Sequence, residues 1–453
     1  MTAFASDQVA TPPPGSRVSI LISWVIILVS VLTLGIANLV SPAREAVARA
    51  TDEAQVLVLA KYAVGANAIA RAMGGEMPLE TAADLDGAVQ RLATTPAGRL
   101  RAVAVIGELE GSTAALAELQ DLEPALKDAT LSADAAALRT VYSTGAASIP
   151  TSARDGLLAR HGWFARLALG SGLGGDAALH RQAVAGGTRV VAAMLGLLLG
   201  GTLALIGGTA LLTLAIVRLV DARVRLAYAP PNRSAAPFLE AFALYLGGMV
   251  AIGLLVRFLL HGRPFLSSWI ALGWVPVAFV WPLLRGMTWA ELREGLGWNL
   301  GRGMAREIGA GALSYLGMLP IAVAGLLVTT LLSYLARANP VHPIITEFRG
   351  GWRNAAQLYL LACVYAPIVE ETMFRGAMFH HLRQRHRWLF SAIVSGLLFA
   401  ALHPQGWTAI PLLGAMGVVF CAIREWRGTV LASGTTHAIN NAVAVTLMLV
   451  LFG

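Results

Sequence analysis

The stretch YAPIVEETMFRG, residues 365–376, places two glutamates and an arginine inside a long apolar segment. Apolar residues flank Glu370, Glu371 and Arg375 on both sides, where a membrane-spanning helix is expected. A charged side chain near the centre of a bilayer costs about 2.5 to 3.5 kcal/mol on insertion scales, so such residues are rare and usually functional. The fold and the function of the chain therefore depend on what surrounds these three side chains.

The composition indicates an integral membrane protein. Of the 453 residues, 56% are hydrophobic and 13% are charged, and the charged fraction is about half that of an average soluble protein. We therefore predict an all-α fold, a polytopic membrane helix bundle of about nine spans with an inserted extracytoplasmic helical domain. The apolar runs long enough to cross about 30 Å of hydrocarbon are 18–40, 190–217, 236–256, 267–284, 308–335, 355–379, 388–403, 406–423 and 429–452.

The same runs divide the chain into four predicted parts. Residues 1–41 contain a signal-anchor or first membrane span, and the first run also fits a cleaved signal peptide. Residues 42–187 form the inserted helical domain, and residues 188–335 form membrane helices without recognisable chemistry. Residues 336–453 form the core that carries the charged stretch.

The charge distribution predicts the orientation. Outside residues 42–187, fifteen arginines fall on one side of the alternating loops and five on the other. Because cytoplasmic loops are rich in basic residues, we expect a cytoplasmic N-terminus and an extracytoplasmic location for residues 42–187. The net charge of +8 thus reflects contact with membrane lipid, and nucleic acid is not an expected partner. The preference for arginine over lysine favours a bacterial plasma (inner) membrane.

The inserted segment 42–187 contains no recognisable site. It holds 13 Lys and Arg against 16 Asp and Glu, and it shows no metal-spaced His or Cys cluster, glycine phosphate loop or nucleophile motif. The favoured interpretation is a spacer or docking module, and the alternative is a substrate sensor.

The acidic residues outside that segment single out the charged stretch. Only ten occur there, and eight of them lie in loops or near the ends of apolar runs; Glu370 and Glu371 are the exceptions. Glu371 and Arg375 are four residues apart and meet on one helical face, whereas Glu370 is rotated by about 100°. A structural ion pair thus explains Glu371, but Glu370 needs a partner from elsewhere.

Two histidines are candidates for that partner. His403 ends the apolar run SGLLFAALH, with Phe399 four residues before it, and His437 lies in SGTTHAINNAV, with Asn441 four residues after it. A spacing of four places each pair on one helical face. The basic run HHLRQRHR, residues 380–387, is expected at the cytoplasmic lipid surface.

The segments EETMFR, FAALH and HAINN together resemble the CPBP family of intramembrane proteases, also called the CAAX prenyl endopeptidase or Abi family. The motifs of that family run in the same order: Glu-Glu-x-x-x-Arg, then Phe-x-x-x-His, then His-x-x-x-Asn or Asp. The resemblance covers about residues 355–445, a fifth of the chain. It implies an intramembrane endopeptidase that acts on a peptide or membrane-protein substrate.

The resemblance also implies roles for individual residues. Glu370 and His403 would activate a water molecule as general base, and His437 and Asn441 would stabilise the oxyanion of the attacked carbonyl. A neighbouring ion pair would orient the helix and its glutamate. The catalytic residues implied in this way are Glu370, Glu371, Arg375, His403, His437 and Asn441.

A zinc-dependent version of the reaction remains open at this stage. Glu370, His403 and His437 would then be the ligands of Zn²⁺, since three such ligands and a water satisfy a catalytic zinc site. The chain lacks the His-Glu-x-x-His helix of familiar zinc peptidases, which favours a glutamate-centred mechanism without a certain cofactor.

Two further function classes fit parts of the pattern. A proton-coupled transporter also uses intramembrane Glu, His and Arg, but its charges are expected along a path and often within repeats. A membrane scaffold or self-protection protein could keep the same fold without catalysis, although intact motifs count against it.

Overall fold

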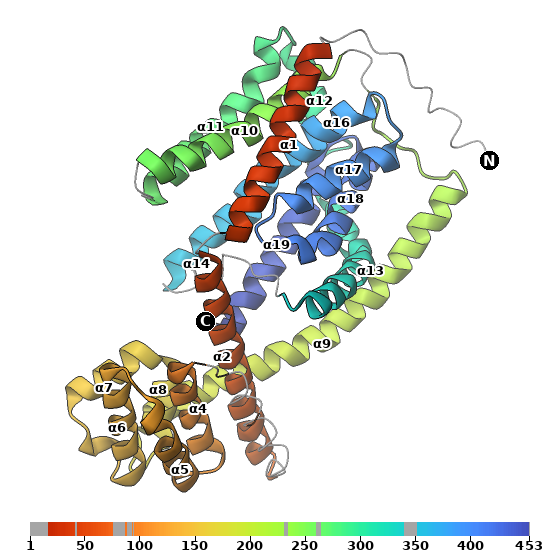
Figure 1. Cartoon of the computed structure of the whole chain (residues 1–453). Helices are drawn as coiled ribbons and strands as arrows, with labels where there is room; N and C mark the ends of the chain where they lie inside the picture. Colours follow the sequence, from red (N-terminus) through yellow and green to blue (C-terminus); the bar gives the residue numbers. More distant parts are fainter. Residues whose placement is uncertain are drawn as a thin grey trace. The chain divides into compact units, whose positions relative to one another are not determined.

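The computed structural model describes residues 17–40, 43–75, 87, 93, 95–230, 234–259, 264–338 and 351–452. These residues form helices and their connections and contain no strand, which confirms the all-α prediction. The helices (Figure 1) are α1 (Arg17–Val40), α2 (Ala43–Ala72), α4 (Pro96–Leu109), α5 (Ser112–Leu122), η1 (Glu123–Ala125), α6 (Ala129–Ser143), η2 (Ala146–Ser148), α7 (Thr151–His161), α8 (Trp163–Ser171), α9 (Ala177–Val220), α10 (Ala236–Leu259), α11 (Pro264–Leu284), α12 (Trp289–Leu296), α13 (Met304–Ala336), α14 (Gly351–Tyr359), η4 (Leu360–Tyr365), α15 (Ala366–Glu370), η5 (Glu371–Met378), α16 (Phe379–Arg383), α17 (Trp388–Ala401), η6 (Trp407–Ala409), α18 (Ile410–Arg427) and α19 (Val430–Phe452).

Contacts within the chain separate two compact units. The first comprises Met1–Glu45 and Thr202–Thr446, and the second comprises Ala46–Gly201 and Leu447–Gly453. The second unit contains most of the segment expected to be extracytoplasmic; that location stays a prediction.

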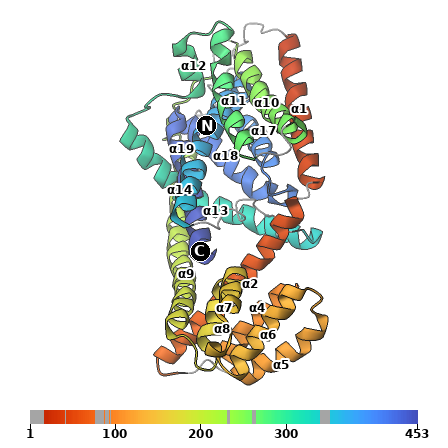
Figure 2. The ribbon, with the colours of Figure 1, turned by 90° about the vertical axis from the view of Figure 1, so that its left-hand side faces the viewer.

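The second unit packs the short helices α4 to α8 and parts of the longer helices α2 and α9 around an apolar core, in which α4 packs against α5 and α8 (Figures 1 and 2). α4 begins at a cap in which the Thr95 hydroxyl accepts a hydrogen bond from the Gly98 N–H at 3.0 Å, and such a cap stabilises the first turn. Gly162 has a φ of 53° and lets the chain turn sharply between α7 and α8. Core side chains include Leu100, Val103, Leu119, Leu157 and Leu167.

A buried ion cluster ties α6 to α7 in this unit. Asp134 is 2% exposed; Arg160 Nε donates to its Oδ2 at 2.8 Å, and His161 Nε2 lies 3.0 Å from the same oxygen. Burial alone would raise the pKa of Asp134, but the hydrogen bonds from Arg160 and His161 outweigh it and hold that pKa below its usual value. The cluster therefore has a structural explanation.

The apolar helices identify an integral membrane protein. Among the described residues, six helices are long and apolar enough to cross a bilayer: Arg17–Ala37, Ala177–Val220, Ala236–Val256, Met304–Ala336, Trp407–Arg427 and Val430–Leu451. Within the first unit, α1 packs against α10, α10 against α11, and both α13 and α17 against α18 (Figures 1 and 2).

The described residues give six candidate spans, so the number of nine stays a prediction. Of the other runs, Trp388–Ala401 is a shorter apolar helix, and α11 (Pro264–Leu284) contains the apolar stretch Gly273–Leu284. The third, 355–379, lies in the uninterrupted helical stretch 351–383, whose turns alternate between α-helical (α14, α15, α16) and π-helical (η4, η5).

The basic run 380–387 does not lie at the surface as expected, except for its last three residues. The His380 Nδ1 lies 2.7 Å from the Tyr228 hydroxyl, and both Arg383 Nη2 and Nε donate to the Glu425 carboxylate, at 2.9 and 3.0 Å. The first part of the run is therefore buried, because segments distant in the sequence supply partners for its polar groups.

Candidate active site

The chain reaches the candidate site through two π-helical turns. η4 is followed by the short helix α15 and then by η5, which begins at Glu371. Pro367 lies in the first turn of α15. A proline has no N–H and clashes with the carbonyl four residues earlier in a continuous α-helix, so a change of register at this point is physically reasonable. Such π turns occur frequently at functional sites.

Close packing fixes the position of η5. A Cβ atom added at Gly376 would lie 2.8 Å from the Leu296 carbonyl oxygen at the end of α12, so only glycine allows this approach. The Trp298 indole N–H donates to the Thr372 hydroxyl at 3.0 Å. The glycine that ends the stretch YAPIVEETMFRG therefore allows the backbone that follows the glutamates to approach α12.

Glu371 and Arg375 form the ion pair that their spacing predicts. The Arg375 Nη1 lies 3.1 Å from the Glu371 Oε1, and the two residues are 0% and 1% exposed. The Arg375 Nη2 donates to the Gly417 carbonyl at 3.3 Å. Its Cζ lies 4.5 Å and 4.8 Å from the ring centroids of Phe399 and Phe420, so aromatic faces also stabilise the buried guanidinium.

His437 lies between the two glutamates. Its Nδ1 is 3.1 Å from the Glu371 Oε1, and its Nε2 is 3.8 Å from the Glu370 Oε2. The ring stacks on Phe420 with centroids 5.0 Å apart and planes 18° apart. Because an ionised carboxylate only accepts hydrogen bonds, the contact to Glu371 places a proton on Nδ1. The other ring nitrogen, Nε2, faces Glu370.

His403 approaches the same carboxylate from α17. Its Nδ1 lies 2.6 Å from the Phe399 carbonyl oxygen, and its Nε2 lies 3.9 Å from the Glu370 Oε2. A carbonyl oxygen can only accept, so Nδ1 carries the proton and Nε2 is the acceptor in the neutral ring. The four-residue spacing in FAALH thus fixes which nitrogen faces Glu370.

The centre of the cluster is the Glu370 Oε2, which is buried without a hydrogen-bond partner among the described residues. The two imidazole nitrogens at 3.8 and 3.9 Å are too distant for direct hydrogen bonds. Two groups that each hydrogen-bond one water molecule at about 2.8 Å in a tetrahedral arrangement lie about 4.6 Å apart, which is farther than these atoms are. The Glu370 Oε2 can therefore accept a hydrogen bond from a water molecule.

Asn441 contacts the π turn that precedes the glutamates. Its Nδ2 donates to the Ala362 carbonyl oxygen at 2.7 Å, and its Oδ1 accepts from the Asn440 side chain at 3.3 Å. An amide nitrogen carries two hydrogens, so one N–H remains for another acceptor. The expected donor is thus also a link between α19 and η4.

The described residues give no support for a metal site. Within the described ranges, no group of three or more His, Cys, Asp and Glu side chains is arranged to hold one. The interpretation as a metalloprotease is therefore not supported.

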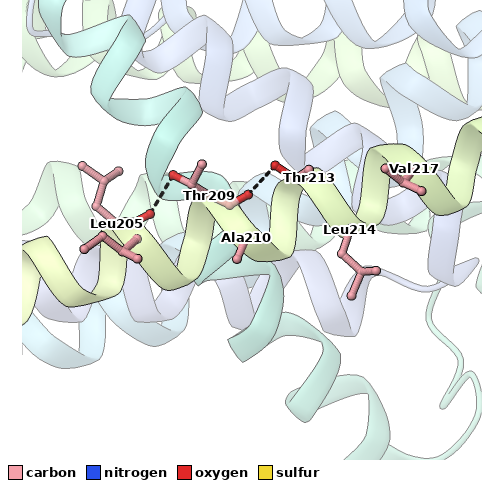
Figure 3. Close-up of a pocket in the computed structure, with 7 residues that line it drawn as sticks. Leu205, Thr209, Ala210, Thr213, Leu214 and Val217 are labelled. Carbon is pink, nitrogen blue, oxygen red and sulfur yellow. Dashed lines mark hydrogen bonds between the residues drawn. The ribbon is translucent and has the colours of Figure 1, made fainter.

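A hollow beside α9 is not part of this cluster. It has a volume of about 780 Å³ and is lined by residues between Leu205 and Val217, including Thr209 and Thr213 (Figure 3). Both hydroxyls donate to carbonyl oxygens of α9 at 2.8 Å. The hollow thus offers an apolar wall and none of the residues expected in catalysis.

Sequence reasoning missed three residues that contact or precede the cluster. Phe420 stacks on a histidine, but its contact depends on how α18 and α19 pack, and no local pattern indicates it. Ala362 contributes only a carbonyl oxygen. Pro367, three residues before Glu370 in an apolar run, was a usable signal, because a proline inside a helix disrupts the α-helical register.

The comparison with known families agrees with the motifs. The family described as type II CAAX prenyl endopeptidase Rce1-like matches residues 352–443, which include all six expected catalytic residues. No curated protein and no solved structure matches the chain significantly. The resemblance to CPBP proteases is thereby confirmed for this segment. Residues 352–443 therefore match the Rce1-like family model, in agreement with the CPBP, or CAAX protease, family.

Proposed function

We propose that this protein is an intramembrane endopeptidase that hydrolyses a peptide bond with a water molecule activated by Glu370 and His403. The observation that carries the proposal is the position of the Glu370 carboxylate, which faces the Nε2 atoms of His403 and His437 at 3.9 and 3.8 Å. Both Nδ1 atoms have fixed hydrogen-bond partners. The family match supports CAAX-type protease activity in general.

The first step is attack by water. The Glu370 carboxylate and the His403 Nε2 each accept one hydrogen of the water molecule, which directs an oxygen lone pair at the substrate carbonyl carbon. As the new C–O bond forms, Glu370 takes one proton and acts as the general base. When the C–N bond breaks, protonated Glu370 gives that proton to the leaving nitrogen, and the carboxylate is restored.

The second requirement is stabilisation of the oxyanion. His437 can donate from Nε2 when both of its ring nitrogens carry protons, because the Nδ1 proton is directed at Glu371. Asn441 contributes the N–H that does not bond to Ala362. Donors held in place before the reaction cost little reorganisation in the transition state, and the loss of one typically lowers kcat about 10² to 10³-fold.

The proposed substrate is a peptide or a segment of a membrane protein that reaches the site within membrane lipid. We also propose the topology that the arginines predict, with a cytoplasmic N-terminus, extracytoplasmic residues 42–187 and a bacterial plasma membrane location. Nucleic acid has no role in the proposal.

The test is a proteomic comparison of cells that express the wild type with cells that express Glu370→Gln. Glutamine keeps the shape of the side chain but cannot act as the base, so we expect at least a 10²-fold loss of cleavage at unchanged membrane abundance. New peptide termini should occur only with the wild type. Glu110→Gln, an exposed position in the second unit, is the matched control and should cleave normally.

The purified protein then provides the quantitative arm. The substrate found in cells is incubated with wild type and Glu370→Gln in proteoliposomes. If the glutamine variant cleaves at the wild-type rate, Glu370 is not the base and the proposed mechanism is wrong.

A further inference from the structure

We infer that Pro367 is a positioning residue for Asn441, acting through the Ala362 carbonyl group. This inference rests on the proposed function, because it assigns Asn441 to the oxyanion site. Pro367 is not proposed to touch the reacting atoms. Its effect comes from the hydrogen that its backbone nitrogen lacks.

The backbone of η4 has a π-helical register, in which hydrogen bonds join residues five apart. The Ala366 N–H bonds to the Leu361 carbonyl oxygen, five residues earlier. In that register the next carbonyl, that of Ala362, would be paired with the nitrogen of Pro367. Proline has no N–H. The Ala362 carbonyl is thus left without a donor from its own helix, and an unpaired carbonyl in an apolar surrounding is costly.

Asn441 supplies the missing donor. Its Nδ2 lies 2.7 Å from the Ala362 oxygen, a short distance for an N–H···O bond. This bond fixes one of the two amide hydrogens, and the planar amide then determines where the second one points. His437, one turn earlier on α19, is held by Glu371 and Phe420. The two proposed oxyanion donors are thereby oriented by different partners.

The substitution Pro367→Ala tests the inference because it restores a backbone N–H. The helix can then satisfy the Ala362 carbonyl itself, either in the π register or by reverting to an α register. Asn441 would lose its exclusive acceptor and with it the restraint on its amide plane. The effects of Pro367→Ala and Asn441→Ala must therefore depend on each other.

The first measurement is stability and does not require activity. Thermal midpoints of the full chain in detergent are compared for wild type, Pro367→Ala, Asn441→Ala and the double variant. With Pro367 present, Asn441→Ala leaves the Ala362 carbonyl unpaired and should lower the midpoint. In the Pro367→Ala background we expect less than half of that decrease. Equal decreases in both backgrounds would overturn the inference whether or not the protein is a protease.

The second measurement is cleavage of the substrate identified in cells. Asn441→Ala should lower kcat about 10²-fold, as the loss of one oxyanion donor does. A small misplacement of a catalytic group costs up to about 10²-fold, and we expect about a tenfold loss for Pro367→Ala with KM unchanged. The double variant should be no slower than Asn441→Ala. If the two single-variant losses of kcat multiply in the double variant, Pro367 does not act by positioning Asn441.

Pro276→Ala provides the matched control, since Pro276 is also inside a helix, α11. Its effect on the midpoint and on kcat should combine with that of Asn441→Ala without coupling. If wild type shows no proteolysis at all, the proposed function fails, while the stability measurement still decides whether Pro367 positions Asn441.

Discussion

Replacing Arg375 by methionine should strongly destabilise the protein. The guanidinium is fully buried, and it is paired with Glu371 at 3.1 Å. Methionine fills a similar volume but leaves the Glu371 carboxylate buried without its cation. Removal of one partner from a buried pair costs about 3 to 5 kcal/mol. The lost contacts to the rings of Phe399 and Phe420 act in the same direction, so we expect about 4 kcal/mol or more.

The measurement is the free energy of unfolding in mixed micelles titrated with a denaturing detergent. Arg375→Met combined with Glu371→Gln removes both charges, and a buried pair replaced by uncharged groups is often neutral. The double variant should therefore recover at least half of the lost stability. Arg218→Met, at an exposed position at the end of α9, is the control and should change stability by less than about 0.5 kcal/mol.

Two results would refute this reasoning. If Arg375→Met lies within about 1 kcal/mol of the wild type, the ion pair does not neutralise a buried charge. If the double variant is as unstable as the single one, the loss comes from packing and not from the unpaired carboxylate.

Three further predictions concern other groups. Burial, with Arg189 and Arg166 nearby, lowers the pKa of Lys61 to about 8, so the unfolded chain binds more protons than the folded chain between pH 8 and 10.5. Lys61→Met should therefore stabilise the second unit by up to about 3 kcal/mol below pH 8 and by progressively less toward pH 10.5. A gain in stability that does not depend on pH would contradict this prediction. Because the pKa of Asp134 is lowered in the fold, the ionised carboxylate stabilises the folded state above pH 4, and this stabilisation is lost in acid. Asp134→Asn should lower the free energy of unfolding by about 3 to 5 kcal/mol at pH 7 and by less at pH 3, as measured by denaturant unfolding. Cleavage by the purified protein should survive chelator treatment, with metal analysis below one zinc per chain; stoichiometric zinc whose removal abolishes cleavage would overturn the glutamate mechanism.

The sequence indicated the class of protein and the local part of the site. Low charge and long apolar runs predicted membrane helices, because burial of apolar surface in lipid depends on composition. The contact between Glu371 and Arg375, and that between Phe399 and His403, followed from a spacing of four residues. Helix geometry fixes such contacts without knowledge of the rest of the fold.

The structure corrected predictions that depended on packing. The basic run 380–387 was expected at the lipid surface, but its first residues are buried because Tyr228 and Glu425 come from distant segments to meet them. Among the described residues, six of the nine apolar runs lie in helices long and apolar enough to cross a bilayer.

The sequence by itself determined which chemical groups are present and which neighbours share a helical face. Only the tertiary structure decided that His437 lies between Glu370 and Glu371, that Phe420 stacks on it, and that Asn441 bonds to Ala362. These contacts join α15 and η4 to α18 and α19, and the rotation of one helix against another is set by the packing of all their side chains. That rotation is not contained in the spacing within any single motif.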